Sequence, residues 1–425
     1  MSIINGLKNN AHIFILFFLL GGIYLGYANV WLCVVAFVLA ISKLNNDEIF
    51  LVGLLVGTEY IGVISRIFIG FTVIPQLIIS ILIFIALIPR LPALHKLNSY
   101  NSFLFYSLLL IFVIAYLYGP GHSYSNYKIF KILCNGLLYY WVFLTFNQSK
   151  KIRIEQISYI YAITGVTYLV MAVSYYHMGT PSSIFDFGFL GRVAFANHDI
   201  ERTISYHSIG LSALYGASFL MASPDDNFLL RKKNILMFLF FLFIALLSQM
   251  RQGIIGIMLL FFLRYVLLSR KKSIYTYSSI IVIFVMAFFI IYQSFSTDAF
   301  QAMANAASFE ELTNRSFDKA LLLIKQSPVI GHGLGGYSAD GQISYPHNIF
   351  LEIVVEMGFV GLLYIIAICA IVIRNNHFTY RYCNLSNIYI VLFLFAVLIR
   401  INLSNDLSEN IYFFSLLFSL KQWRS

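Results

Sequence analysis

The sequence predicts an all-α protein that lies in a membrane as a bundle of transmembrane helices. Of its 425 residues, 60% are apolar and only 11% are charged, which leaves too little polar surface for a soluble protein of this size. The apolar residues also occur in long runs separated by short polar breaks. Because a helix needs about 20 apolar residues to cross a hydrocarbon core of about 30 Å, such runs indicate repeated membrane crossings.

The apolar runs predict about 12–14 membrane helices, a range that reflects several short runs. We expect them near residues 12–28, 29–43, 48–65, 69–88, 101–118, 130–147, 156–175, 204–222, 234–249, 252–268, 276–293, 349–373, 386–402 and 408–421. The first run has no small-residue cleavage site and another apolar run follows it directly, so we expect a retained anchor. Together the runs predict a single integral membrane domain over residues 1–425.

Lysine and arginine predict the orientation, because short loops rich in these residues stay in the cytoplasm. With the N-terminus inside, 18 of the 28 basic residues but only 5 of the 18 acidic residues lie on the cytoplasmic side, and both termini are cytoplasmic. The net charge of +10 therefore reflects membrane topology and does not indicate nucleic-acid binding. The 4 cysteines show no paired spacing, so we expect neither disulfides nor a metal site.

Two long segments on the outer side interrupt the short connections, residues 176–203 and 294–348. Loops longer than about 12–15 residues are usually functional or disordered. Within the longer loop, residues 316–326 form an amphipathic run, and the proline and glycines of 327–337 then stop a helix and begin irregular backbone. The apolar positions at helical spacing are Phe317, Ala320, Leu321 and Ile324. We expect a helix followed by tight turns, packed on the membrane surface.

Four arginines at the outer side are candidates for binding an anion. Arg251 lies between two apolar runs, where its forked donors suit phosphate oxygens, although it could instead reach lipid headgroups. Arg315 begins the amphipathic run and is either an anion ligand or a solvated loop charge. Arg192 and Arg202 either pair with neighbouring carboxylates at the surface or complete an anion site with Arg251.

His347 is the candidate general base, at the start of the predicted helix that follows the long loop. A helix N-terminus favours the neutral imidazole, which could accept a proton from a sugar hydroxyl, whereas a lone loop histidine is more often structural. Glu352 and Glu356 follow at four-residue spacing on one helix face and could orient the imidazole or bind sugar hydroxyls. No phosphate loop or Ser-His-Asp pattern is present, so chemistry driven by ATP is not expected.

The segment from Arg315 through Gly361 resembles the O-antigen polymerase and O-antigen ligase superfamily of bacterial envelope glycan assembly. The residues that carry the resemblance are Arg251 between two helices, Arg315 ahead of Gly331, the turn that ends at Tyr337, and His347-Asn348 followed by Gly358 and Gly361. The last two glycines, at three-residue spacing, predict a close approach of another helix. The resemblance covers roughly residues 190–370 together with the overall topology.

The resemblance implies a metal-independent, inverting glycosyltransferase with a fold similar to the GT-C class, without a cofactor, at the periplasmic face of the bacterial inner membrane. Its donor would be an undecaprenyl-pyrophosphate-linked oligosaccharide, and Arg251 and Arg315 would stabilise the departing pyrophosphate. His347 would take or position the proton of the acceptor hydroxyl. Further substrate-binding candidates are Arg192, Arg202, Tyr337, Asn348, Glu352 and Glu356, and the structural candidates are Gly331, Gly358 and Gly361.

Three activities remain open. A polymerase would use a second lipid-linked repeat unit as acceptor, and the spacing of Arg315 and Gly331 favours it. A ligase would transfer the glycan to the lipid A core. A flippase for lipid-linked oligosaccharide would be expected to place charges along a central cavity, whereas the arginines cluster at the outer surface. Expected partners are the lipid-linked glycan, membrane lipid and a chain-length-regulating co-polymerase.

Overall fold

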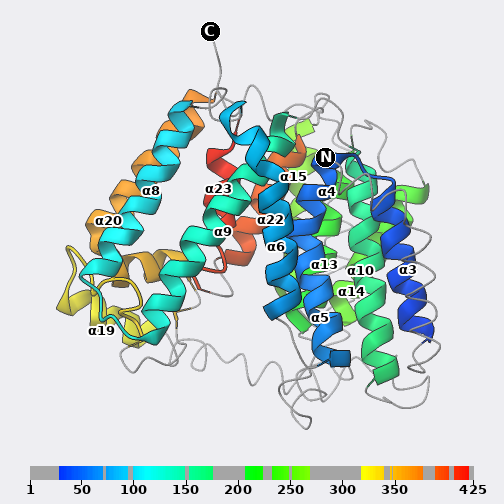
Figure 1. The fold of residues 1–425 in the computed structure, drawn as a ribbon, viewed down its shortest axis with the longest axis horizontal. Coiled ribbons are helices and arrows are strands. Elements are labelled where there is room, and N and C mark those ends of the chain that lie inside the picture. Colours follow the sequence, from blue (N-terminus) through cyan, green and yellow to red (C-terminus); the bar gives the residue numbers. More distant parts are fainter. Residues whose placement is uncertain are drawn as a thin grey trace. The chain divides into compact units, whose positions relative to one another are not determined.

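The structure, a computed structural model, describes residues 28–69, 73–93, 99–148, 153–175, 206–223, 232–247, 251–268, 317–338, 345–346, 348–376, 388–401 and 406–420. Throughout these residues the regular elements are helices and no strand occurs, so the predicted all-α class is confirmed (Figure 1). Four helices in the described residues are long and apolar enough to cross a membrane. They cover Gln76–Ala93, Ser99–Leu117, Ser123–Asn147 and Ile349–Asn375.

Shorter apolar helices also occur where the sequence predicts membrane crossings, for example Ser208–Met221 and Gly253–Arg264. The expected runs at 12–28 and 276–293 lie outside the described residues, as do the loop 176–203 and most of the loop 294–348. The total of 12–14 membrane helices therefore stays a prediction.

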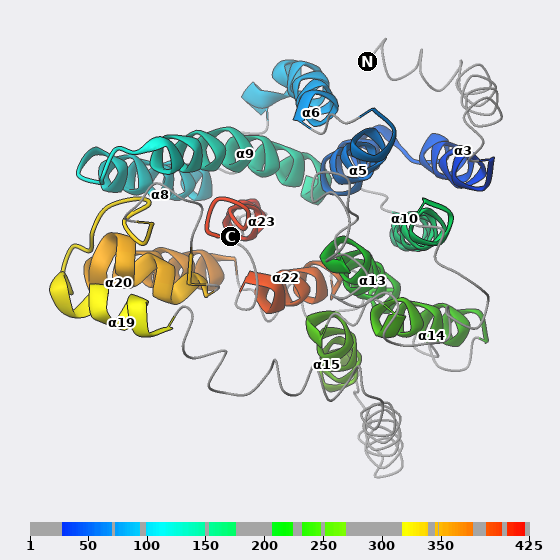
Figure 2. The same cartoon turned by 90° about the horizontal axis from the view of Figure 1, so that it is seen from below.

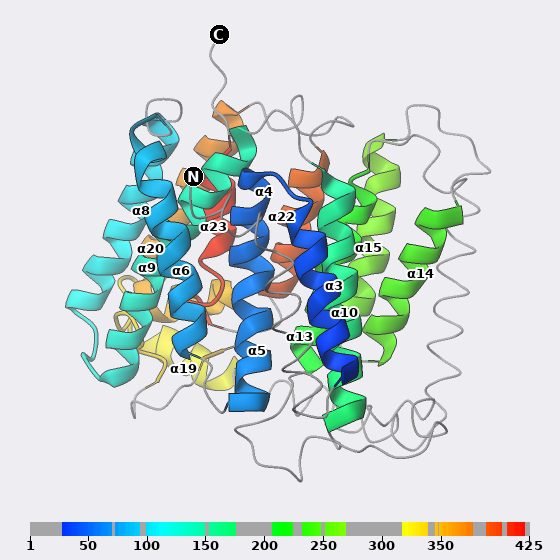
Figure 3. The same ribbon diagram turned by 45° about the vertical axis from the view of Figure 1, so that its right-hand side comes forward.

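The chain divides into two compact units, and the first contains Met1–Ala86, Lys150–Gln301 and Cys383–Ala396. Its helices are α3 (Ala28–Ser42), α4 (Asn46–Val52), the π-helical η1 (Gly53–Gly57), α5 (Thr58–Ile69), most of α6 (Val73–Leu87), α10 (Ile154–Tyr175), α13 (Tyr206–Met221), α14 (Lys232–Leu247), α15 (Arg251–Leu268) and the first part of α22 (Ile388–Ile401). Helix α13 contacts α10, α14 and α15 (Figure 2), and α3 lies along α10 (Figure 3).

Aromatic side chains and glycines pack the first unit. The ring of Tyr161 stacks on Phe219 with centroids 5.9 Å apart, and Phe219 lies 5.0 Å from Phe393 of α22. A Cβ atom on Gly216 would overlap the Phe241 ring, and one on Gly253 would lie 3.2 Å from the Gly210 carbonyl oxygen. Small residues therefore let the backbones of α13, α14 and α15 approach closely, as is usual between membrane helices.

The second unit contains Leu87–Ser149, Ala302–Tyr382 and Val397–Ser425. Its helices are the 3₁₀-helical η2 (Ile88–Arg90), α8 (Ser99–Leu117), α9 (Ser123–Gln148), α19 (Phe317–Gln326), α20 (Ile349–Asn375), the end of α22, and α23 (Tyr412–Phe418). Helices α8 and α9 form an antiparallel hairpin, and α23 packs against α8, α9 and α20 (Figure 1).

Two membrane runs expected in this unit differ from the sequence prediction. The expected helix at 408–421 is wrong, because turns occupy the residues after Asp406 and only Tyr412–Phe418 is helical. The Asp406 carboxylate accepts hydrogen bonds from Ser408 Oγ and Glu409 N, which favours a turn over a helix there. The expected helix at 349–373 forms but bends at Gly358, whose φ of 65° is not helical, so α20 has two arms that run in different directions (Figure 1).

Candidate functional site

The site is built around the first arm of α20, Ile349–Met357, which begins directly after the segment that holds His347. Asn348 caps this arm, since its side-chain oxygen accepts hydrogen bonds from Phe350 N at 3.0 Å and Leu351 N at 3.1 Å. An asparagine in this position satisfies amide groups that have no partner within the helix. The cap therefore gives Asn348 a structural role, and contact with a substrate stays a prediction.

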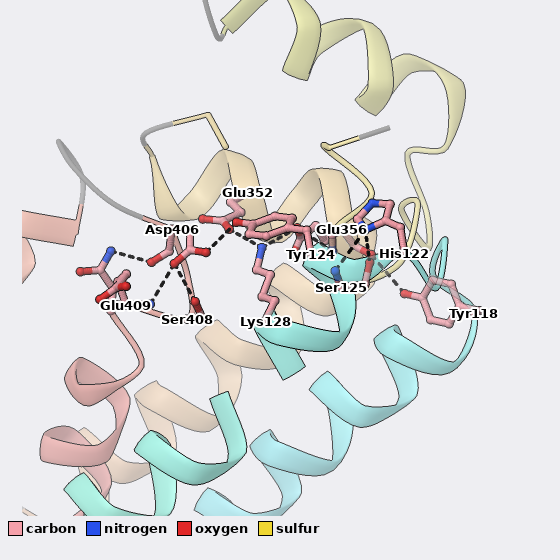
Figure 4. Close-up of polar contacts among 12 residues, drawn as sticks. Tyr118, His122, Tyr124, Ser125, Lys128, Glu352, Glu356, Asp406, Ser408 and Glu409 are labelled. Carbon is pink, nitrogen blue, oxygen red and sulfur yellow. Dashed lines mark hydrogen bonds and ion pairs between the residues drawn. The ribbon is translucent and has the colours of Figure 1, made fainter. Parts of the chain in front are cut away.

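Glu352 and Glu356 lie one turn apart on the buried face of this arm, and both accept hydrogen bonds from the Lys128 ammonium of α9 (Figure 4). The Lys128–Glu356 contact measures 2.6 Å, and all three side chains are about 1% exposed. Burying charged groups is costly unless they are paired and hydrogen-bonded. One lysine thus holds two carboxylates, and the second oxygen, Oε2, of each carboxylate is buried without a hydrogen-bond partner in the described part of the chain.

A glycine-rich turn over residues 331–337 fits between this arm, α8 and α9. Glu356 Oε1 accepts a second hydrogen bond, from Gly335 N at 2.9 Å, and Leu334 N donates to the Ala115 carbonyl oxygen of α8. Gly335 has a φ of 83°, and a Cβ atom there would overlap the Ser125 hydroxyl. Only glycine both adopts this φ readily and leaves room for the Ser125 hydroxyl. The turn thereby packs closely against α8, α9 and α20.

Residues 327–333, which lead into this turn, supply hydrogen-bond partners for backbone groups of α20 that have no helical partner at the bend. His332 N and Gly333 N donate to the carbonyl oxygens of Val355 and Glu356, at 2.8 and 2.9 Å. On the other side of the bend, Phe359 N donates to Pro328 O at 2.9 Å, and Val360 N donates to Val329 O at 3.2 Å. Irregular backbone at membrane depth is tolerated only when its polar groups are satisfied in this way.

This arrangement corrects the expectation that Gly358 and Gly361 let another helix approach. A Cβ atom on Gly358 would overlap Val329, so the close neighbour is the turn. A Cβ atom on Gly361 would overlap Met357 of the same helix, because the bend brings the two arms together. Gly331, with a φ of 71°, faces the backbone of Glu356 and Met357, which an added Cβ atom would overlap. Its structural role stays a prediction.

A second group of polar side chains continues the row along α9 (Figure 4). The Tyr124 hydroxyl donates to Asp406 Oδ2 at 2.6 Å, and both side chains are buried. The His122 Nδ1 atom accepts from Ser125 N at 3.1 Å, which leaves the proton of a neutral ring on Nε2. Tyr118 donates to Ile330 O at 2.7 Å, and burial together with the negative charge of Glu356 raises the pKa of Tyr118.

Tyr345 lies close to these carboxylates. Burial, and then the negative charges of Asp406 and Glu352, raise the pKa of its phenol above the ordinary value. The phenol therefore remains protonated at neutral pH and can donate a hydrogen bond.

Helix α19 packs on the first arm of α20 through Ala320 and Ile324, two of the four apolar positions expected at helical spacing. Ala320 is buried against Tyr337 and Val355, while Leu323 and Ile324 pack beside them. Leu321, another of these positions, is 49% exposed, because it lies beside the face that Ala320 and Ile324 bury. Tyr337 is a buried core residue here, and burial raises its pKa. Its predicted contact with substrate stays a prediction.

The described residues do not include every predicted site residue. Arg192, Arg202, Arg315 and His347 lie outside them, and Arg251 begins α15 in the first unit, where its side chain is not described. The residues that the structure does bring together are Tyr337, Asn348, Glu352, Glu356, Gly331 and Gly358, all in the second unit. Within the described ranges no group of three metal-ligating side chains is present.

Sequence reasoning missed Lys128, Tyr124 and Asp406. A lysine within an apolar helix was the signal that could have found the first of them, because such charges are costly and usually have a specific partner. The predicted helix began at residue 130, which left Lys128 in a loop, whereas α9 begins at Ser123.

Comparison with known proteins gives one family relationship. Residues 236–366 match the family model Wzy_C, described as O-antigen ligase. This match confirms the resemblance to the O-antigen ligase and polymerase superfamily in that part of the chain. No curated protein in the comparison matches the chain. The matched segment includes Glu352 and Glu356 but not their partner Lys128.

Proposed function

We propose that this chain, whose residues 236–366 match the O-antigen ligase family, is an O-antigen polymerase. It would join undecaprenyl-pyrophosphate-linked oligosaccharide repeat units at the periplasmic face of the inner membrane. The family match supports glycosyl transfer, because it spans Arg251, Arg315 and His347, the residues with the chemistry that such a transfer needs, and the spacing of Arg315 and Gly331 favours the polymerase. The four long apolar helices agree with a substrate that is itself anchored in lipid.

In the proposed reaction, an acceptor hydroxyl oxygen attacks the anomeric carbon of the donor sugar from the face opposite the pyrophosphate. The bond from that carbon to the pyrophosphate oxygen breaks, and undecaprenyl pyrophosphate leaves with the bonding electrons. Arg251 and Arg315 stabilise the negative charge that develops on the leaving group. His347 accepts the hydroxyl proton or positions the hydroxyl for attack. The sugar-pyrophosphate bond supplies the energy, so no nucleotide is required.

The surroundings of the first arm of α20 support this assignment. Catalytic groups need supporting residues that fix them, and sites on rigid elements are more precise than sites on loops. Lys128, the carboxylates of Glu352 and Glu356, and the turn at Gly335 fix the arm that begins one residue after Asn348. His347 directly precedes that cap in sequence, so its backbone is attached to a firmly held helix start.

An O-antigen ligase is the second candidate, favoured because the matching family is described as O-antigen ligase. The two activities share the donor and the leaving group and differ in the acceptor. A lipopolysaccharide gel of a strain deleted for the gene separates them. Core carrying a single repeat unit identifies the polymerase. Core without any repeat, with polymer accumulating on the lipid carrier, identifies the ligase.

Complementation of the deletion strain tests the site residues. Arg251→Ala, Arg315→Ala and His347→Ala should each insert normally in the membrane but abolish long glycan chains. Lys325→Ala is the matched control, because this exposed lysine of α19 lies in the same loop and should leave chain synthesis intact. Normal chains from His347→Ala would remove the histidine from the mechanism. A deletion strain in which no repeat unit reaches the outer face would indicate a flippase.

A further inference from the structure

We propose that Val329 and Ile330, at the tip of the 327–331 turn, form an apolar wedge that inserts into membrane lipid beside α20. The two side chains are 60% and 59% exposed, although they belong to a loop that the sequence places outside the membrane. Two adjacent branched apolar side chains at a turn tip are unfavourable in water. The proposal concerns the fold and does not rest on the proposed activity.

Backbone hydrogen bonds fix the depth of the wedge. Val329 O accepts from Val360 N, and the neighbouring Pro328 O accepts from Phe359 N, so the tip lies level with the first residues of the second arm of α20. That arm belongs to the candidate membrane span Ile349–Asn375. On its other side, Ile330 O accepts from the Tyr118 hydroxyl at the end of α8. The tip is therefore joined to the bend within one candidate span and to the end of another.

The exposed faces of these two helices continue the apolar surface of the wedge. On α20 the exposed apolar residues follow helical spacing along one face, namely Phe359, Val360, Leu363 and Ile366. On α8 a matching face carries Phe103, Leu110, Ile114 and Leu117, and Leu117, 75% exposed, lies next to Tyr118. Apolar faces of this length on candidate membrane helices contact lipid. The turn that carries the wedge is joined by hydrogen bonds to Phe359 and Val360 of the one face and to Tyr118, next to Leu117 of the other.

The polar groups around the wedge favour lipid as its partner. The carbonyl oxygens of Pro328, Val329 and Ile330 all accept hydrogen bonds, so these carbonyl groups do not require water. The exposed Lys325 of α19 lies two residues before the turn in sequence and suits the phosphate groups of lipid headgroups. An apolar tip beside a basic residue is the pattern of a segment that lies at the membrane interface.

Photo-crosslinking in vesicles tests the wedge. The purified full-length chain is reconstituted in phosphatidylethanolamine and phosphatidylglycerol, with a photoreactive benzoylphenylalanine replacing Val329. Leu363 on α20 serves as the position that faces lipid, and the exposed Asp318 of α19 serves as the position that faces water. We expect position 329 to give a lipid adduct at a yield similar to that of position 363 and several-fold above that of position 318.

Two results would overturn the proposal. The absence of a lipid adduct at position 329, with a normal yield at 363, would show that the tip faces water. A covalent dimer at position 329 would show that a second copy of the chain covers it. If the photoreactive variant does not fold, Val329→Trp with lipids brominated near the headgroup gives an independent measurement, in which unquenched emission from that residue contradicts the wedge.

Discussion

In the first unit buried charges bind backbone groups at helix ends, whereas in the second unit the buried Lys128 binds two buried carboxylates of another helix. Glu48 completes a capping box with Asn45 and accepts from the backbone of Arg153, and Arg264 donates to the Ser223 carbonyl oxygen just after α13. Lys128, by contrast, binds carboxylates 224 and 228 residues away. The first arrangement holds helix ends through backbone groups, with Arg153 105 residues from Glu48 and Ser223 41 residues from Arg264, whereas the second pairs buried charged side chains of different helices.

The difference has an energetic consequence. The loss of a cap leaves backbone groups at a helix end without a partner, and water or neighbouring residues can replace part of the lost hydrogen bonding. A buried lysine that is lost leaves two carboxylates without a counter-charge, where water cannot compensate. We therefore expect the second unit to be more sensitive to single substitutions than the first, and the following variants test this in order of decreasing effect.

Lys128→Met should have the largest effect, because it leaves Glu352 and Glu356 buried and unpaired. We expect the free energy of unfolding to fall by about 3–5 kcal/mol, measured by titrating the purified protein from mild detergent into dodecyl sulfate. Lys131→Met on the same helix is the control. Its partner Glu409 is 43% exposed, so the loss should be at most about 1 kcal/mol.

The same comparison can be sharpened by removing the carboxylate charges. The triple variant Lys128→Met, Glu352→Gln and Glu356→Gln should recover part of the lost stability, because no unpaired charge remains. Equal losses in the single and triple variants would show that packing of the lysine stem, and not its charge, stabilises the second unit.

Gly358→Ala should destabilise the protein by about 2–4 kcal/mol, since the new methyl group meets both an unfavourable φ and the Val329 carbonyl. Gly121→Ala separates the two causes. Gly121 has a φ of 67° but no atom within 4 Å of the added Cβ, so only the backbone cost of about 1–2 kcal/mol remains. Similar losses in the two variants would show that the turn moves away freely from α20.

Tyr124→Phe removes the hydroxyl that donates to the buried Asp406 carboxylate. A hydrogen bond to a charged group contributes about 1.5–3 kcal/mol, and we expect a loss of this size in the same detergent titration. Tyr127→Phe is the control, because this tyrosine is on the exposed side of α9 and should change the stability little. No difference between the two variants would mean that Asp406 finds another donor.

Asn45→Ala in the first unit should have the smallest effect, about 1 kcal/mol, because it removes only the side-chain half of a capping box. Asn46→Ala, one residue further into the helix, should cost less. A loss at Asn45 as large as that at Lys128 would contradict the proposed difference between the units.

In the second unit, the sequence predicted α19 and the turns after Asp406 least well. The amphipathic run of α19 was found, but its apolar positions included the exposed Leu321 and left out Leu323, which packs on the core, because apolar residues lie on both sides of this short helix. The turns after Asp406 were missed because hydropathy does not register a side chain that bonds its own backbone.

By itself, the sequence determined the membrane class, the all-α fold and the approximate position of most helices, because the hydrocarbon core requires long apolar runs. Its glycines and proline also marked the turn at 327–337. Only the tertiary structure decided that this turn provides hydrogen-bond partners for the backbone at the bend in α20, and that Lys128 binds Glu352 and Glu356. Both depend on contacts between residues distant in sequence, and neither hydropathy nor local spacing specifies which distant partner a buried charge or an interrupted helix will find.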